Sequence, residues 1–89
     1  MKKYELLRLA LKTRGFSLEA LGDIVFDGTV KSVVSMRLSG RTPWRIEEAY
    51  KILDALRLPH SWLPLLFPPN GIADVTDEQR DMIRFGRVA

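Results

Sequence analysis

The chain of 89 residues contains no cysteine and only one histidine, His60. Without cysteine there is neither a disulfide framework nor a thiolate zinc site, so apolar packing must stabilise the fold. A lone histidine with only carboxylates to assist it makes a poor zinc site, and His60 is expected to be a surface or capping residue. We therefore expect neither a metal nor a cofactor.

The sequence also lacks a long hydrophobic run. No apolar segment approaches the roughly 18 residues that a transmembrane helix requires. The first residues include two lysines, but Glu5, Arg8 and Lys12 interrupt the apolar residues at helical spacing, which indicates a folded helix rather than a signal peptide. A cytoplasmic protein that makes no membrane contact is expected.

Patterns typical of catalysis are scarce. The neighbouring acids Glu47 and Glu48, like Asp77 and Glu78, project about 100° apart on a helix and cannot face each other as an acid and base pair. The Asp27-Gly28 turn lacks the Gly-Lys-Ser/Thr ending of a phosphate-binding loop. A chain this short also forms one compact core with little room for a catalytic cleft, so an enzyme is not expected.

What is present is a series of apolar stripes at helical spacing, which predicts five or six short helices and no strand. The expected helices cover about 2–13, two helices within 16–44, about 44–57, about 62–67 with Ser61 as its cap, and a last helix that begins at a Thr76-x-x-Gln79 capping box and ends near Gly86. In the helix over 44–57 the apolar stripe comprises Ile46, Ala49, Tyr50, Leu53 and Leu56. The composition suggests a main domain over 1–69 and a C-terminal extension over 70–89.

The segment 16–44 predicts two helices joined by a turn. Ser17 caps the first helix, with Phe16 and Leu21 spaced as a hydrophobic staple. The second helix opens at Asp27 or Thr29, runs over 30–39, and ends at Gly40, which supplies the left-handed residue. Its apolar positions are expected to be Val30, Val33, Val34 and Leu38, and its outward positions Lys31, Ser32, Ser35, Met36 and Arg37.

Charge is distributed unevenly along the chain. Residues 1–45 contain nine Lys or Arg and four acids, a balance of +5, whereas residues 46–89 contain five and seven, a balance of −2. The predicted helix pair therefore lies in the basic half. Basic residues beside a helix that enters a DNA groove supply the attraction to phosphate on which non-specific affinity depends.

These motifs resemble the Cro and lambda-repressor-like helix-turn-helix family, also called the XRE family. The resemblance is carried by Leu38-Ser39-Gly40-Arg41 at the end of the second helix, by Lys-Thr-Arg-Gly over 12–15, and by PWRIEEAYKILDALRLP over 43–59. It covers residues 3 to about 68 and implies an all-α, lambda-repressor-like helix-turn-helix bundle that binds double-stranded DNA. In the family, the first helix of the pair has an alanine near its start and a glycine four residues later, at the turn. Here Gly22 stands at the alanine position and Phe26 at the glycine position. The turn glycine is instead Gly28, so the turn is about two residues longer.

From this pattern we expect base-edge contacts from Lys31, Ser32, Ser35 and Met36. Phosphate contacts are expected from Ser17, Thr29, Arg37, Arg41 and Thr42, with Lys12 or Arg14 as further candidates. By analogy with the family, Trp44 has a structural role beneath the following helix. The resulting hypothesis is a dimeric transcriptional repressor of the phage or mobile-element type, and the alternative is a helical protein-interaction module, such as an antitoxin-like or adaptor domain.

The C-terminal half carries apolar residues beyond those that a small core requires. The candidates for a homodimer interface are Trp62, Leu65, Leu66 and Phe67 in one patch, and Met82, Ile83 and Phe85 in the other. Docking of the last helix on its own core is an equally acceptable interpretation of the second patch.

Overall fold

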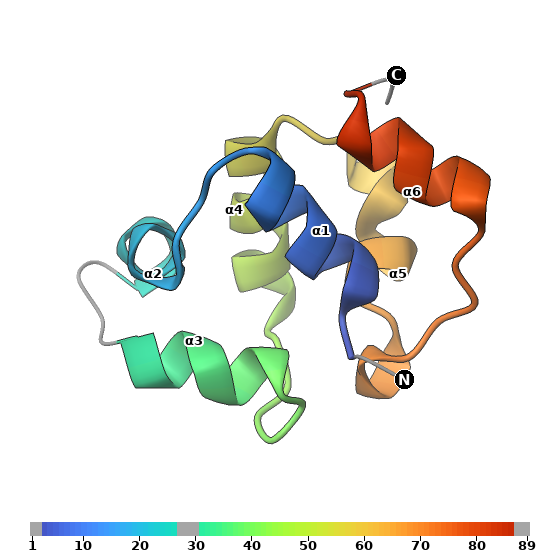
Figure 1. The fold of residues 1–89 in the computed structure, drawn as a ribbon. Coiled ribbons are helices and arrows are strands. Elements are labelled where there is room, and N and C mark those ends of the chain that lie inside the picture. The colour runs from blue at the N-terminus through green and yellow to red at the C-terminus, as the bar shows by residue number, and fades with distance from the viewer. Residues whose placement is uncertain (1–2, 27–30, 87–89) are drawn as a thin grey trace.

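The computed structural model describes residues 3–26 and 31–86 of the protein. Within these ranges every regular element is helical, which confirms the expected all-α class. Figure 1 shows short helices that cross one another around a common centre. The described elements, in chain order, are α1 (Glu5–Thr13), α2 (Leu18–Phe26), α3 (Lys31–Leu38), α4 (Ile46–Leu56), the 3-10 turn η1 (His60–Trp62), α5 (Leu63–Leu66), the 3-10 turn η2 (Pro69–Gly71) and α6 (Asp77–Arg84).

Several helix ends form as the sequence predicts. The Ser17 hydroxyl accepts a hydrogen bond from the Ala20 amide at 3.0 Å, which satisfies a free donor in the first turn of α2. At the start of α6, the Thr76 hydroxyl accepts from the Gln79 amide, and the Gln79 side chain accepts from the Thr76 amide. Gly40 follows α3 with a φ of +83°, which glycine adopts without steric cost.

The start of the chain differs from the prediction, because α1 begins at Glu5 rather than near residue 2. Tyr4 has a left-handed φ of 56°, and its amide donates to the Gly71 carbonyl at 2.7 Å. Its ring lies so close to η2 that a Cβ at Gly71 would be 2.7 Å from the Tyr4 Cε2 atom. The first turn of α1 is therefore fixed by a contact with a segment almost seventy residues away in sequence.

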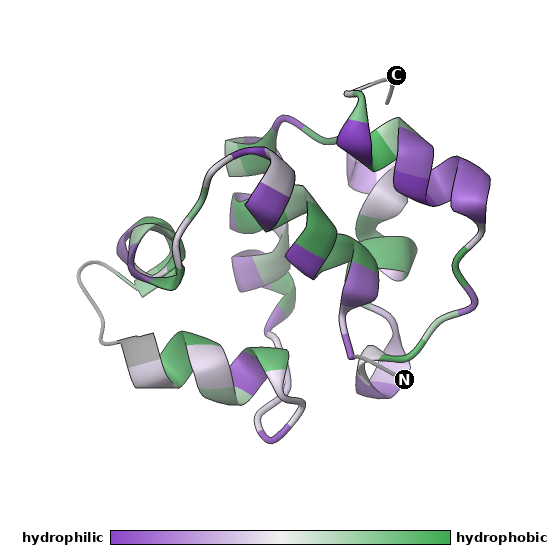
Figure 2. Ribbon diagram, viewed as in Figure 1, coloured by the Kyte–Doolittle hydropathy of each residue, from purple (hydrophilic) through white to green (hydrophobic). Residues whose placement is uncertain are grey.

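The core surrounds α1, which packs against α5 and α6, while α2 packs against both α3 and α4. In Figure 2, α6 is hydrophilic over most of its length, whereas α4 and α5 carry more hydrophobic residues. The largest fully buried side chains come from every α-helix and are Leu6, Leu7, Leu21, Val34, Ile52, Leu53, Leu66 and Ile83. Removing this apolar area from water is the main stabilising contribution that a chain without cysteine can make.

The predicted dimer interface is wrong for three of its residues. Trp62, Leu66 and Ile83 are 8%, 0% and 1% exposed and belong to the core of their own chain. The additional apolar residues of the C-terminal half help to cover α1, because α6 packs against that helix. Of the remaining candidates, Leu65, Phe67 and Met82 are half-buried against the same core, and Phe85 is 66% exposed.

Residues 70–89 were expected to form an extension, but their described part, 70–86, is joined to the main domain by polar contacts as well as by Ile83. Arg80 Nε lies 2.6 Å from a Glu5 carboxylate oxygen, and Arg14 donates to the Ile83 carbonyl at 3.3 Å. The chain from residue 70 to residue 86 thus shares one core with the helices before it.

Two local predictions near α4 are also wrong. Ile46 and Tyr50 are 59% and 38% exposed, and Ile52 occupies the core in their place, because α2 and α5 cover a different side of α4 from the one expected. Ser61 lies inside η1 and does not cap α5 through its side chain. Pro64 does fall in the first turn of α5, where its missing amide costs no hydrogen bond.

Candidate nucleic-acid interface

α3 is held against the protein by one face only. Val34 and Leu38 are 0% and 3% exposed, and the helix packs on α2. In Figure 1, α3 crosses the axis of α2 at the edge of the molecule, with no described helix covering its outer side. The helix can therefore present its opposite face to a partner.

That opposite face of α3 carries short polar side chains and one methionine. Ser32 and Ser35 are exposed, Met36 is 45% exposed, and the spacing of these residues with Ser39 places all four on one side of the helix. Three of the predicted base-reading residues thus lie together. Lys31 begins the helix, but its side chain lies outside the described part of the structure, as does Thr29, a predicted phosphate contact.

Arg37 was expected to face outward and contact phosphate, but this prediction of its orientation is wrong. Its guanidinium forms two hydrogen bonds with the Glu48 carboxylate, at 3.0 and 3.2 Å, and both side chains are only 12–13% exposed. The same guanidinium lies over the Phe26 ring at 4.7 Å and near the Trp44 ring at 6.0 Å. Arg37 therefore joins α3 to the end of α2 and the start of α4, which fixes how α3 is held.

The loop after α3 supplies two of the predicted phosphate contacts. Arg41 is exposed and Thr42 partly exposed, and the amides of both donate to the Met36 carbonyl, at 3.1 and 3.4 Å. These bonds hold the loop close to the exposed face of α3. Ser17 is also exposed, and although its oxygen accepts from Ala20, its own proton remains a possible donor.

Two basic residues near this loop were not predicted as contacts. Arg8 donates to the Leu38 carbonyl at 2.9 Å and to the Lys3 carbonyl at 2.9 Å, so it joins α1 to the end of α3. The Lys3 side chain crosses Gly40, where a Cβ would be 2.8 Å from the Lys3 Nζ. The excess of basic residues near the N-terminus was the sequence signal that could have indicated this group.

Lys12 and Arg14, the two further candidates for phosphate contact, lie in different environments. Lys12 is exposed on α1, whereas Arg14 is half-buried and donates to the carbonyls of Leu56 at the end of α4 and Ile83 in α6, so it is held against these two helices rather than beside α3. Trp44 packs against the core with its ring edge-on to Tyr4 and Phe67, which agrees with a structural role for this residue.

The described residues were also searched for metal ligands and for membrane-spanning helices. Across residues 3–26 and 31–86 no three His, Asp or Glu side chains gather as metal ligands would. His60 lies at the surface, as expected, with its Nε2 atom 2.7 Å from an Asp54 oxygen. No described helix is both long enough and apolar enough to cross a membrane.

The chain was compared with protein-family models, with curated proteins and with solved structures, and none of them matches it. No relative therefore indicates a partner for the exposed face of α3. Its chemistry has to be inferred from the residues on that face and around it.

Proposed function

We propose that this protein binds double-stranded DNA sequence-specifically, with the exposed face of α3 in the major groove, and that it acts as a dimeric repressor of transcription in the cytoplasm. The observation that carries the proposal is a short helix with one buried apolar edge and an opposite edge of Ser32, Ser35 and Met36. Serine hydroxyls can donate to or accept from any base edge, and an apolar side chain such as methionine can contact the thymine methyl group.

The charges around α3 support the same partner. Lys3 and Arg8 lie at the carboxyl end of the helix, and Arg41 follows it directly. Cations so placed can contact the phosphates that flank a groove, and each contact releases condensed counterions. Four of the seven acidic residues in the second half of the chain lie in α6 or just before it, at the other side of the molecule from α3 (Figure 1), and these are Asp74, Asp77, Glu78 and Asp81.

A dimer is proposed on energetic grounds. One recognition helix contacts only a few base pairs, and a single small module buries too little surface for high specificity. Two copies bound to a pseudo-palindrome double the number of base pairs contacted and the surface buried. Of the apolar residues first considered for this contact, Phe85 is the most exposed. Sedimentation of the protein with and without its preferred duplex measures the stoichiometry, and one protein per site would contradict the dimer.

The first experiment tests base contact. Preferred duplexes are selected from a random pool, and affinity for the selected and a scrambled duplex is measured by fluorescence anisotropy. Ser35→Ala should cost about 1 to 3 kcal/mol on the selected duplex and much less on the scrambled one, because a base contact exists only at the correct sequence. Equal losses on both duplexes would contradict the assignment of Ser35.

The second experiment tests phosphate contact and includes a matched control. Arg41→Ala should weaken all duplexes alike and reduce the slope of log affinity against log salt by about one unit. Arg84→Ala removes the same charge from α6, far from α3 in Figure 1, and should leave the slope unchanged. Absence of any salt-dependent duplex binding by the unmodified protein would reject DNA and favour a helical protein-interaction module.

A further inference from the structure

α3 is a short helix that is held along one edge, although it carries the proposed DNA-reading residues. It spans Lys31–Leu38 and packs on α2, with Val34 and Leu38 buried. A helix held along one edge can rotate about its long axis, whereas base contacts require side chains kept within about 10 to 20° of one orientation. A contact from another direction is therefore needed to fix the rotation of α3.

Arg37 supplies this contact from the flank of α3. Its guanidinium donates to both oxygens of the Glu48 carboxylate, from Nε to Oε1 at 3.0 Å and from Nη2 to Oε2 at 3.2 Å. Two parallel bonds of this kind form in only one relative orientation of the two groups. Both side chains are 12–13% exposed, so water competes little for the bonds. The rotation of α3 is thus tied to the first turn of α4.

The Glu48 carboxylate is in turn held by the backbone of its own helix. Its Oε1 atom also accepts from the Arg45 amide at 2.9 Å, at the start of α4. Its negative charge lies in the first turn, where the helix dipole stabilises an anion. Glu48 therefore offers its oxygens to Arg37 from a fixed position.

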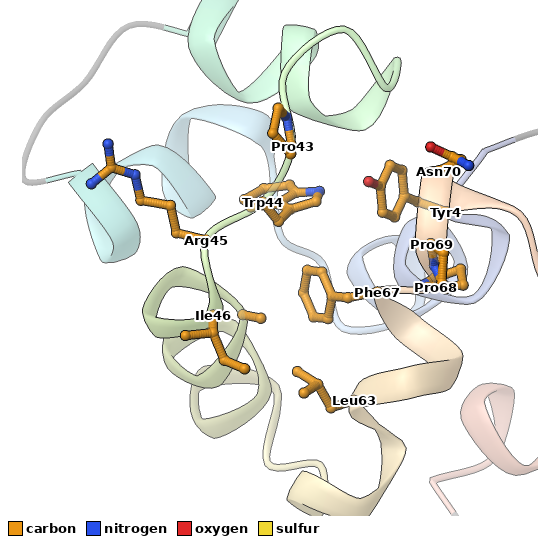
Figure 3. Close-up of a pocket in the computed structure, with 11 residues that line it drawn as sticks. Tyr4, Pro43, Trp44, Arg45, Ile46, Leu63, Phe67, Pro68, Pro69 and Asn70 are labelled. Atoms are coloured by element: carbon orange, nitrogen blue, oxygen red, sulfur yellow. The ribbon is translucent and has the colours of Figure 1, made fainter.

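Aromatic rings complete the surroundings of the guanidinium. The Arg37 Cζ atom lies 4.7 Å from the centroid of the Phe26 ring and 6.0 Å from that of the Trp44 ring. Figure 3 shows the Trp44 ring grouped with those of Tyr4 and Phe67, whose centroids are 6.4 and 5.6 Å from its own. The guanidinium thus rests against side chains that are themselves packed, on the side of α3 that faces α2 and α4.

We propose that Glu48 is a positioning residue for DNA recognition. Through Arg37 it sets the rotation of α3, and with it the sequence discrimination of the protein, although neither residue contacts DNA. This inference rests on the proposed DNA-binding function. It also changes the role that the sequence suggested for Arg37, because a guanidinium held by Glu48 contributes orientation rather than a phosphate contact.

The DNA experiment measures discrimination, defined as the ratio of the affinities for the selected and the scrambled duplex. Glu48→Gln and Arg37→Met should each lower this ratio about tenfold, as much as the loss of one base contact. The double variant should lower it no further, because both changes break the same link. Arg37→Met should also leave the slope of log affinity against log salt unchanged, since it removes no phosphate contact.

Glu47→Gln is the matched control. Glu47 is exposed and precedes Glu48 in the first turn of α4, so its neutralisation changes the net charge equally and leaves the pair intact. It should leave discrimination unchanged. Circular dichroism first establishes that each variant is folded at the temperature of the measurement. Glu48→Asp, which keeps the charge but is one methylene shorter, replaces Glu48→Gln if the latter does not fold.

Amide hydrogen exchange in the full chain without DNA tests the positioning separately. Glu48→Gln should speed exchange at the amides of α3 and leave those of Leu7 and Leu11 in α1 unchanged. Faster exchange confined to α3, in a chain that binds no duplex, would reject the DNA-binding function and keep the role of Glu48 in holding α3. Exchange that is unchanged or equally faster in all helices, discrimination unaffected by Glu48→Gln, or a reduced salt slope in Arg37→Met would overturn the proposal.

Discussion

Replacing Ile83 by alanine tests whether α6 belongs to the folded core or is a device for dimerisation. Ile83 is 1% exposed and packs within the cluster that covers α1. The change removes three buried carbons, worth roughly 2.4 kcal/mol at about 0.8 kcal/mol each. The cavity left behind adds to this, so the free energy of unfolding should fall by about 3 to 4 kcal/mol.

Urea denaturation followed by circular dichroism measures this loss. With a slope of about 1 to 3 kcal/mol per molar, the midpoint should fall by more than about 1 M. Ile46→Ala is the matched control, because it removes the same three carbons from a side chain that is 59% exposed, and its effect should stay within about 0.5 kcal/mol. Both variants are measured at two protein concentrations a hundredfold apart.

The two concentrations separate a core residue from an interface residue. A core position loses the same free energy at each concentration, whereas stability lost from a dimer interface depends on the amount of protein. A loss below about 1 kcal/mol for Ile83→Ala, or a loss that appears only at the higher concentration, would refute the reasoning that α6 is part of the core.

Three further outcomes are expected. In a double-mutant cycle with Arg37→Met and Glu48→Gln, urea denaturation should give a coupling free energy of about 1 to 3 kcal/mol, since the pair is mostly buried and bidentate; additive losses would contradict a direct pair. Gly40→Ala should lower the free energy of unfolding by about 1 to 2 kcal/mol, because φ is +83° and the added Cβ would displace the Lys3 side chain; an unchanged midpoint would contradict this. Burial raises the pKa of Tyr4 above its ordinary 10.0, so the unfolded chain loses this proton first and stability should fall as the pH rises above that value; Tyr4→Phe should lessen the fall, and identical pH profiles would count against the burial.

The local signals in the sequence predicted the helix ends well. The cap at Ser17, the capping box at Thr76 and Gln79, and the stop at Gly40 all form in the structure. Each depends on hydrogen bonds between residues no more than three or four positions apart, or on the conformational freedom of one glycine. The exposed edge of α3 follows from the same short-range spacing, because its register is fixed once the helix exists.

The sequence by itself therefore determined the helical class, most of the helix boundaries and the polar edge of α3. Only the tertiary structure decided that Ile83, Trp62 and Leu66 cover their own chain, and that Arg37 faces Glu48 instead of solvent. The physical reason is distance along the chain: an apolar residue is buried by whatever packs against it, and a cation is neutralised by whatever carboxylate the fold brings near. Residues such as Glu5 and Arg80, 75 positions apart, meet only when the helices have assembled.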